Sequence, residues 1–283
     1  MLADFDLHRR VGAAIWIARN YAEQGFLDRL ADADGLFADP SCQVIKDQRK
    51  IKVGRVVVEV HGKPQVLFIK RYNMFSWRHR LVSVAAQAGA FRALRGAKIL
   101  SEAGIDTARP VAAIAHRRFG LLTKSFYLSE ELVGGATVDA YWREVLKPLT
   151  GREGVARRRE FLLQLAQLFR RLHERGVYHN DLKDANILVA PGVPDAGLRL
   201  YLLDLEGVRR YSHLSAQRKL KNLVQINRTL GKFLHRRDKL AFLKAYLERS
   251  IRDRAERRSL IKAVERQSRR LDAAKGLIAS DLA

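Results

Sequence analysis

The stretch His179-Asn180-Asp181-Leu182-Lys183-Asp184-Ala185-Asn186, followed by Asp204, decides how this chain folds. Ahead of it, apolar residues recur at intervals of three and four over about 153–175, which predicts a helix that stops at Gly176. Behind it, the runs 187–189 and 200–203 predict the two strands of a hairpin. This arrangement presents Asp181 in a loop and places Asn186 and Asp204 at the strand edges.

These polar residues are typical of a site for phosphoryl transfer. The reaction needs a carboxylate that orients the attacking hydroxyl and a divalent metal that neutralises the phosphates of ATP. The spacing resembles the protein-kinase signature, in which an Asp and an Asn share one loop and a second Asp follows on a later strand. We therefore expect Asp181 to be catalytic, with Lys183 steadying the transferred phosphoryl group. Asn186 and Asp204 are expected to bind Mg²⁺ and ATP.

A second set of candidate residues lies upstream, on predicted strands. Period-two and β-branched patterns predict a meander over 44–45, 53–60 and 66–70, followed by a helix over about 83–103 and an extended stretch from Pro110 to Leu128. Lys70 ends the third strand, where a kinase carries the lysine that binds the α- and β-phosphates. Backbone groups from Glu130 to Leu132 would pair with adenine in a connector between two lobes.

The predicted fold class is α+β, with two lobes of a protein-kinase-like fold. The small lobe, residues 41–130, would hold an antiparallel sheet and one helix. The large lobe, residues 131–283, would be mainly helical and end in basic helices. Residues 1–40 are expected to form a helical extension, because apolar residues from Val11 to Leu30 follow a helical spacing. We favour packing of this extension on the small lobe over an amphipathic helix on a membrane.

Composition narrows the class of protein further. A single cysteine, Cys42, leaves no disulfide partner and indicates a reducing compartment. The acidic start of the sequence does not resemble a signal peptide, and no apolar run approaches the roughly 20 residues of a membrane span. We therefore expect a cytoplasmic protein. A P-loop and a His-Glu-x-x-His zinc motif are both absent from the sequence.

The formal net charge of +23 predicts a polyanionic partner. Nucleic acid, anionic lipid and a phosphorylated glycolipid all fit that charge, and a solvated surface without a partner fits it too. No module with stacking aromatic residues for RNA is visible, so nucleic acid is the less favoured partner.

Over about 43–230, the sequence resembles the lipopolysaccharide core kinases, the Kdo and heptose kinases with a protein-kinase-like fold. The resemblance rests on the catalytic loop and on the segments 68–72, 104–112 and 201–207. It implies ATP-dependent phosphorylation of a sugar hydroxyl of the inner core, an anionic glycolipid acceptor, and a peripheral position on the cytoplasmic face of the inner membrane. Nine basic residues are candidates for docking there: Arg209, Arg210, Arg218, Lys219, Lys221, Arg228, Lys232, Arg236 and Arg237.

The sequence departs from the kinase pattern in several places. Residues 85–100 contain no acid that could pair with Lys70, which leaves Glu102 at the helix end and Gln87 as a polar substitute. The first hairpin has Lys46-Asp47-Gln48-Arg49-Lys50 in place of glycines, so its phosphate contacts would come from cations and backbone N–H groups. The net charge of +23 keeps open a kinase for a protein or an RNA-associated target. The missing helix acid, and Asp204-Leu205-Glu206 in place of Asp-Phe-Gly, keep open a pseudokinase that binds a partner without catalysis.

Overall fold

The computed structural model of the chain describes residues 4–74, 88–119, 121–191, 198–247, 254–274 and 276. Contacts divide the chain into two compact units. The first unit comprises Met1–Glu102, Thr107–Leu132 and Asp204–Val208. The second comprises Ala103–Asp106, Val133–Leu203 and Arg209–Ala283. The domain boundaries expected at residues 40 and 130 stay predictions.

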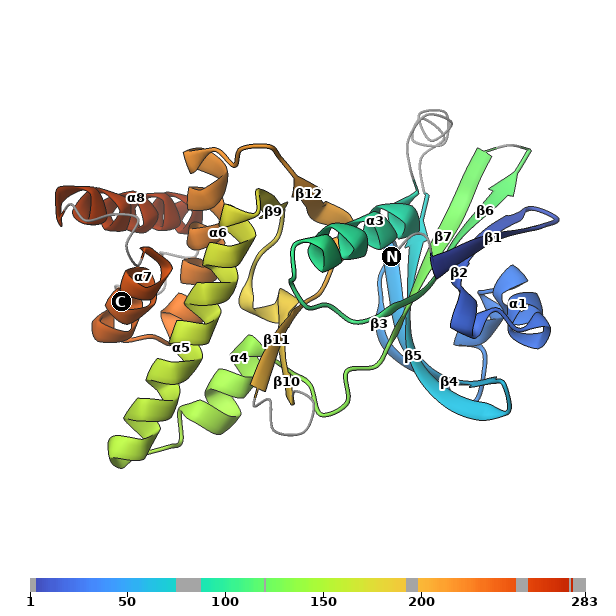
Figure 1. Cartoon of the computed structure of the whole chain (residues 1–283), viewed down its shortest axis with the longest axis horizontal. Helices are drawn as coiled ribbons and strands as arrows, with labels where there is room; N and C mark the ends of the chain where they lie inside the picture. Colours follow the sequence, from blue (N-terminus) through green and yellow to red (C-terminus); the bar gives the residue numbers. More distant parts are fainter. Residues whose placement is uncertain are drawn as a thin grey trace. The chain divides into compact units, whose positions relative to one another are not determined.

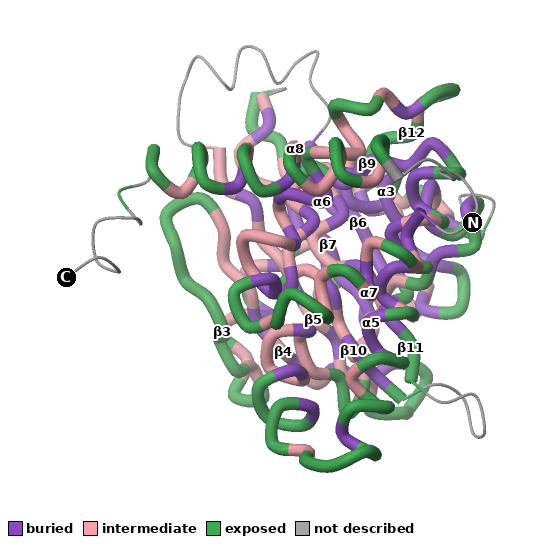
Figure 2. The backbone as a smooth tube through the Cα atoms, turned by 90° about the vertical axis from the view of Figure 1, so that its left-hand side faces the viewer, coloured by how far each residue is buried: buried purple, intermediate pink, exposed green. Residues whose placement is uncertain are grey.

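An antiparallel sheet forms the centre of the first unit (Figure 1). Within the described part of the chain it has seven strands in the order β1-β2-β6-β7-β5-β4-β3. The strands are β1 (Phe5–Arg10), β2 (Ala13–Ala18), β3 (Gln43–Asp47), β4 (Ile51–Val60), β5 (Lys63–Asn73), β6 (Pro110–Arg118) and β7 (Leu121–Glu130). Figure 2 shows buried backbone in the central strands, whereas all five residues of β3 at the sheet edge are exposed. The meander predicted from the β-branched runs is confirmed as β3, β4 and β5.

The described residues of the first unit also form two α-helices, α1 (Gln24–Ala31) and α3 (Gly89–Glu102). Short 3₁₀ turns lie at η2 (Arg19–Tyr21), η3 (Gly35–Phe37) and η6 (Leu205–Gly207). The helix expected over about 83–103 is confirmed where it is described, and residues 83–87 lie outside the described ranges. Gly104, at φ +66°, takes the left-handed conformation that commonly follows a helix end.

The prediction of a helical extension over residues 1–40 is wrong for its first half. Residues 5–10 and 13–18 form β1 and β2, which extend the sheet beside β6. Ala13, Ile15 and Ile17 are buried on one face, so the real period is two, and the helical spacing read from Val11 and Ile15 was coincidental. Sheet pairing with β6 outweighed the local spacing. The second half of the expectation is confirmed as α1, whose Phe26, Leu27 and Leu30 are buried.

The second unit is mainly helical. Its long helix α5 (Gly151–Glu174) buries an apolar stripe that includes Phe161, Leu165, Phe169 and Leu172, as the spacing predicts. The other helical segments are α4 (Val138–Tyr141), the π-helical turn η4 (Trp142–Leu146), η5 (Asp184–Asn186), α6 (Ala216–Arg228), η7 (Leu230–Lys232), α7 (Arg236–Leu247) and α8 (Arg254–Ala273). Among the described residues, no helix has both the length and the hydropathy needed to span a membrane.

Short strands carry the polar loop of the second unit. They are β8 (Ala136–Thr137), β9 (Val177–His179), β10 (Ile187–Pro191) and β11 (Leu198–Leu202), and β12 (Val208–Arg210) crosses the boundary between the units along the chain. The hairpin predicted after the loop is confirmed, because β10 and β11 pair antiparallel. Helix α5 ends before Gly176, which has φ +68° and where a Cβ atom would lie 2.1 Å from the carbonyl oxygen of Tyr211. Only glycine fits this position.

Gly96 in α3 provides a test of the packing in the first unit. A Cβ atom at Gly96 would lie 2.2 Å from the carbonyl oxygen of Leu205, the residue after Asp204. We expect Gly96→Ala to lower the free energy of unfolding by about 1–3 kcal/mol, because the helix and the η6 turn must separate. Denaturant unfolding would measure this change.

The matched control for Gly96→Ala is Gly25→Ala in α1. Gly25 is exposed, and its added methyl group would meet no atom within 4 Å. The control should be neutral or stabilising by up to about 1 kcal/mol, because alanine has the higher helix propensity. Equal effects of the two substitutions would show that the close approach of Leu205 to α3 does not matter for stability.

Candidate active site

The loop between β9 and β10 brings three of the predicted site residues together. The Lys183 ammonium donates to Asp181 Oδ2 at 2.7 Å. The Asn186 amide nitrogen donates to the same oxygen at 3.0 Å and to the backbone carbonyl of Asp181 at 2.7 Å. Asp181 is 47% exposed and Lys183 40% exposed, so both can be reached from solvent. A half-exposed carboxylate with a cation and an amide on one oxygen can accept a hydroxyl hydrogen bond with the other.

His179 supports this loop from beneath. Its side chain is buried, and its Nδ1 accepts a hydrogen bond from the backbone N–H of Asp181 at 3.2 Å. The proton therefore sits on Nε2, which donates to the carbonyl oxygen of Leu203 at 2.9 Å. The imidazole thus joins the Asp181 loop to the end of the strand segment that precedes Asp204. This geometry agrees with a bracing role for His179.

Two residues of α6 hold the same loop and were missed by sequence reasoning. Asn222, which is fully buried, donates to the carbonyl oxygen of His179 at 2.7 Å and to Gln225 Oε1 at 2.9 Å. Gln225 donates to the carbonyl oxygen of Asn180 at 2.6 Å and accepts from the N–H of Leu182 at 3.2 Å. The available signal was an asparagine within the apolar stripe of an amphipathic helix, which indicates a polar group with buried partners.

A buried histidine continues this network away from the loop. His173 of α5 accepts at Nδ1 from the Tyr246 hydroxyl at 2.7 Å, and its Nε2 donates to Asn222 Oδ1 at 3.3 Å. Burial lowers the pKa of His173 to about 4, so the imidazole is neutral at physiological pH. Helices α5, α6 and α7 therefore meet in one hydrogen-bonded chain that ends at the backbone of the Asp181 loop.

In the first unit, Lys70 of β5 pairs with Asp204. The Lys70 ammonium lies 2.5 Å from Asp204 Oδ1 and 5.0 Å from the centre of the Tyr72 ring. Asp204 has φ +58° and ψ +55°, a left-handed conformation that is uncommon for residues other than glycine. Such strain at a polar residue is typical of functional sites. Lys70 and Asp204 are thus brought together in the first unit.

This pair explains how Lys70 is neutralised although the expected helix acid is missing. On α3, Arg92 faces Glu206 at 3.8 Å, and Glu102 pairs with Lys98 at 3.6 Å. Gln87 lies outside the described residues. Asp204 therefore takes the place of a helix carboxylate as the partner of Lys70.

The predicted adenine-pairing segment is partly committed to the sheet. The N–H of Glu130 donates to the carbonyl oxygen of Arg109 at 2.9 Å, and the N–H of Glu131 donates to the carbonyl oxygen of Val66 at 3.2 Å. Neither N–H group can therefore pair with a base. The Glu130 side chain accepts from the Tyr21 hydroxyl at 2.8 Å, which fixes it on the protein. In the part of the chain that the structure describes, the N–H of Leu132 has no acceptor and stays available.

The hairpin that replaces a glycine-rich loop is a tight turn. Backbone hydrogen bonds join Gln48 and Ile51 in both directions, at 2.9 and 3.1 Å, and leave Arg49 and Lys50 exposed at the tip. Lys52 pairs with Asp47 at 3.1 Å. The turn can therefore offer cations to phosphates, as the sequence suggests.

Asn186 in the second unit and Asp204 in the first unit each carry an oxygen of the kind that magnesium binds. Among the described residues, no three His, Cys, Asp or Glu side chains gather into a metal site. Magnesium in nucleotide sites uses one or two protein oxygens and completes its shell with phosphate and water. Both hydrogen bonds described for the Asn186 amide are made by its nitrogen, which leaves its oxygen as a ligand, and Asp204 supplies a carboxylate.

Several of the basic residues expected to dock on a membrane make contacts with other residues of the second unit. Arg228 pairs with Asp272 at 2.7 Å and is largely covered. Arg218 stacks on Tyr211 at 4.0 Å, and the Lys221 ammonium donates to the Asn180 side chain at 3.2 Å. These three contacts favour structural roles, because each cation already has a partner on the protein.

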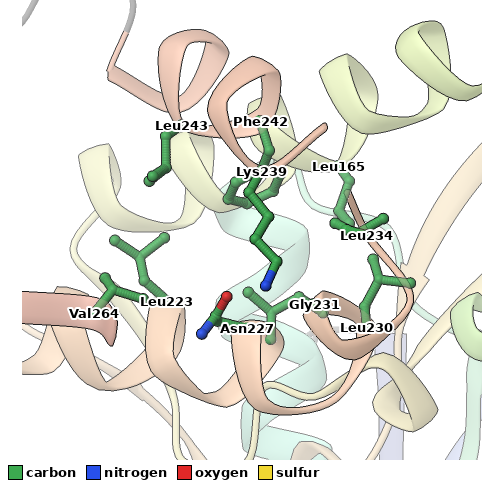
Figure 3. Close-up of a pocket in the computed structure, with 11 residues that line it drawn as sticks. Leu165, Leu223, Asn227, Leu230, Gly231, Leu234, Lys239, Phe242, Leu243 and Val264 are labelled. Carbon is green, nitrogen blue, oxygen red and sulfur yellow. The ribbon is translucent and has the colours of Figure 1, made fainter. Parts of the chain in front are cut away.

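An apolar pocket of the second unit does not contain the predicted site residues. Figure 3 shows it between α5, α6, α7 and η7, with the Lys239 side chain crossing it toward Asn227. Its cavity of about 40 Å³ accommodates a few water molecules at most and is far too small for a nucleotide. The pocket is a packing gap among helices.

The buried histidine predicts how stability depends on pH. The unfolded chain protonates His173 below about pH 6.5, whereas the folded protein does so only below about pH 4. Between these values the unfolded state binds more protons, so acid lowers the free energy of unfolding, by up to roughly 3 kcal/mol. His173→Gln should remove this part of the pH dependence, which denaturant unfolding at pH 7, 5.5 and 4.5 would measure. Parallel curves for the two proteins would contradict a neutral buried imidazole.

The chain is similar to a known protein family and to a solved structure. The model of the lipopolysaccharide kinase (Kdo/WaaP) family matches residues 44–246. A solved structure, WaaP in complex with acyl carrier protein, is similar with a TM-score of 0.60 at 25% sequence identity, covering 88% of this chain and 97% of that chain. No curated protein matches the sequence significantly. The predicted resemblance and the kinase-like α+β fold class are therefore confirmed, and the chain belongs to the lipopolysaccharide kinase (Kdo/WaaP) family.

Proposed function

We propose that this protein transfers the γ-phosphoryl group of ATP to a sugar hydroxyl, of Kdo or heptose, in the inner core of lipopolysaccharide. Membership of the family makes the chain a kinase of the lipopolysaccharide core. The observation that carries the finer proposal is the arrangement of Lys183 and Asn186 on one oxygen of Asp181. That arrangement leaves the other carboxylate oxygen to receive a substrate hydroxyl.

Each residue then has a separate task in the reaction. Asp181 accepts the hydrogen bond of the attacking hydroxyl and takes its proton as the new O–P bond forms. Lys183 stays near the transferred group and stabilises the negative charge that develops on its oxygens. Lys70 binds the α- and β-phosphates. His179, Asn222 and Gln225 position the loop without contacting the substrate.

Magnesium would be held by Asn186 and Asp204. When bound, the ion would supply neutralisation of the phosphate charge. Lys70 and Asp204 lie 2.5 Å apart, so Asp204 is held beside the lysine that would bind phosphate.

The proposed acceptor places the protein at the cytoplasmic face of the inner membrane. The net charge of +23 supports peripheral contact with an anionic surface, because each Lys or Arg near such a surface contributes about 1 kcal/mol. The similar WaaP structure contains an acyl carrier protein. We propose such a carrier as a second partner, and its retention on the purified protein would support this.

The proposed reaction predicts the behaviour of an Asp181→Asn variant. Purified protein with Mg²⁺, ATP and dephosphorylated core oligosaccharide should release ADP, and the acceptor should gain the mass of one phosphate group. Asp181→Asn keeps the shape and loses the base, so we expect kcat to fall by about 10²–10⁴-fold with little change in the KM for ATP. ADP release and mass spectrometry of the acceptor measure both products.

The control for this experiment is Asp6→Asn, which removes a carboxylate of similar exposure that pairs with Arg19 at 3.1 Å. It should retain full activity. Equal turnover by Asp181→Asn and the natural protein would exclude Asp181 as the base. Thermal stabilisation by ATP without ADP release would favour a pseudokinase, and autophosphorylation without transfer to the oligosaccharide would favour a protein kinase.

A further inference from the structure

Two neighbouring turns at one end of the seven-stranded sheet expose apolar side chains. Val11, between β1 and β2, is fully exposed, and Phe119, after β6, is 91% exposed. Isolated apolar residues on a surface are ordinary, but a phenyl ring left almost wholly in water beside a second exposed apolar tip is not. Neither turn contributes to the proposed catalytic residues.

The backbone holds the two turns side by side. Strands β2 and β6 pair with Ala13 opposite His116, and the N–H of Arg117 donates to the carbonyl oxygen of Gly12 at 2.8 Å. Figure 1 shows β1, β2, β6 and β7 next to one another in the sheet. The two apolar residues therefore belong to one surface and cannot move apart without breaking the sheet.

The ring of Phe119 is presented at a conformational cost. Phe119 has φ +51°, in the left-handed region that bulky residues rarely adopt. Its ring stacks against the Arg118 guanidinium at 5.4 Å and still remains exposed. The ring of Phe119 thus gains little burial within the described part of the folded protein.

Two arginines precede each of the apolar residues in the sequence. Arg9, Arg117 and Arg118 are exposed. Arg10 is half-buried, and its guanidinium lies 3.7 Å from Asp28 Oδ1. We call the set Arg9, Arg10, Val11, Arg117, Arg118 and Phe119 the arginine tip.

We propose that the arginine tip docks the protein on an anionic lipid bilayer. An aromatic ring and an aliphatic side chain enter the boundary between headgroups and acyl chains, while the arginines bind lipid phosphates around them. An acidic protein would satisfy the arginines, but a flat protein surface offers no apolar layer for two projecting tips. The proposal rests on the proposed function only for its purpose, which is to hold the enzyme where a membrane-bound acceptor lies.

Vesicle co-sedimentation tests the proposal with the full-length protein. The probes are vesicles of phosphatidylcholine alone and vesicles that contain about 30% phosphatidylglycerol. The second kind has a negative surface potential of the sort that attracts basic segments. The natural protein should bind the anionic vesicles and release them in 0.5 M salt, roughly where screening shortens to a few ångströms. Val11→Ser with Phe119→Ser should weaken binding by about tenfold or more.

Matched variants separate the tip from general charge and hydrophobicity. Arg117→Gln with Arg118→Gln should weaken binding more than Arg152→Gln with Arg159→Gln, which removes the same charge from exposed positions of α5. Val155→Ser, at a residue 58% exposed on α5, should leave binding unchanged. In a Cys42→Ser background, an environment-sensitive dye on Phe119→Cys should shift to the blue with anionic vesicles, and a dye on Val155→Cys should not.

Three outcomes would overturn the proposal: full vesicle binding by the tip variants, an unshifted dye at position 119, or equal binding to neutral and anionic vesicles. The proposal would also be overturned if the tip variants lost binding to an acidic protein but still bound the vesicles. Activity of the tip variants on water-soluble core oligosaccharide should equal that of the natural protein. If no variant transfers phosphate, the proposed function fails while the vesicle results still decide the role of the tip.

Discussion

The hydrogen bonds that three side chains, of His179, Asn222 and Gln225, make to the backbone of the Asp181 loop are the constraint on which the site depends. A loop of irregular backbone has N–H and C=O groups with no strand or helix partner, and such groups are costly to bury unpaired. Together they pair the carbonyl groups of His179 and Asn180 and the N–H groups of Asp181 and Leu182. These four hydrogen bonds restrict the backbone of the loop that carries Asp181, Lys183 and Asn186.

The same reasoning explains the pairing of Lys70 with Asp204. Both residues are largely covered, at 19% and 33% exposed, so each charge needs a partner near it. With no acid on the facing part of α3, Asp204 is the carboxylate that meets this need. The close approach of α3 to Leu205 at Gly96 holds the segment after Asp204, and the left-handed backbone at Asp204 directs its side chain. Packing and strain thus set the position of a charge.

Charge and burial are distributed unevenly over the protein. In the second unit, basic residues such as Arg228 and Lys221 make defined internal contacts. In the first unit, the arginine tip combines cations with exposed apolar side chains and a strained backbone. The total of +23 says only that an anionic partner is favoured, whereas the positions of the arginines beside Val11 and Phe119 indicate what kind of anionic surface fits.

Local periodicity and the spacing of residues close in the chain suffice to predict the fold class, the meander, the helices α3 and α5 and the loop from His179 to Asn186. They do not predict β1 and β2, because Ile15 fits a helical and a strand period equally and pairing with β6 selects the strand. The partner of Lys70, the support from Asn222 and Gln225, and the joining of the turns at Val11 and Phe119 all link residues far apart in the chain. Such contacts depend on how elements pack in three dimensions, and no pattern within one element predicts them.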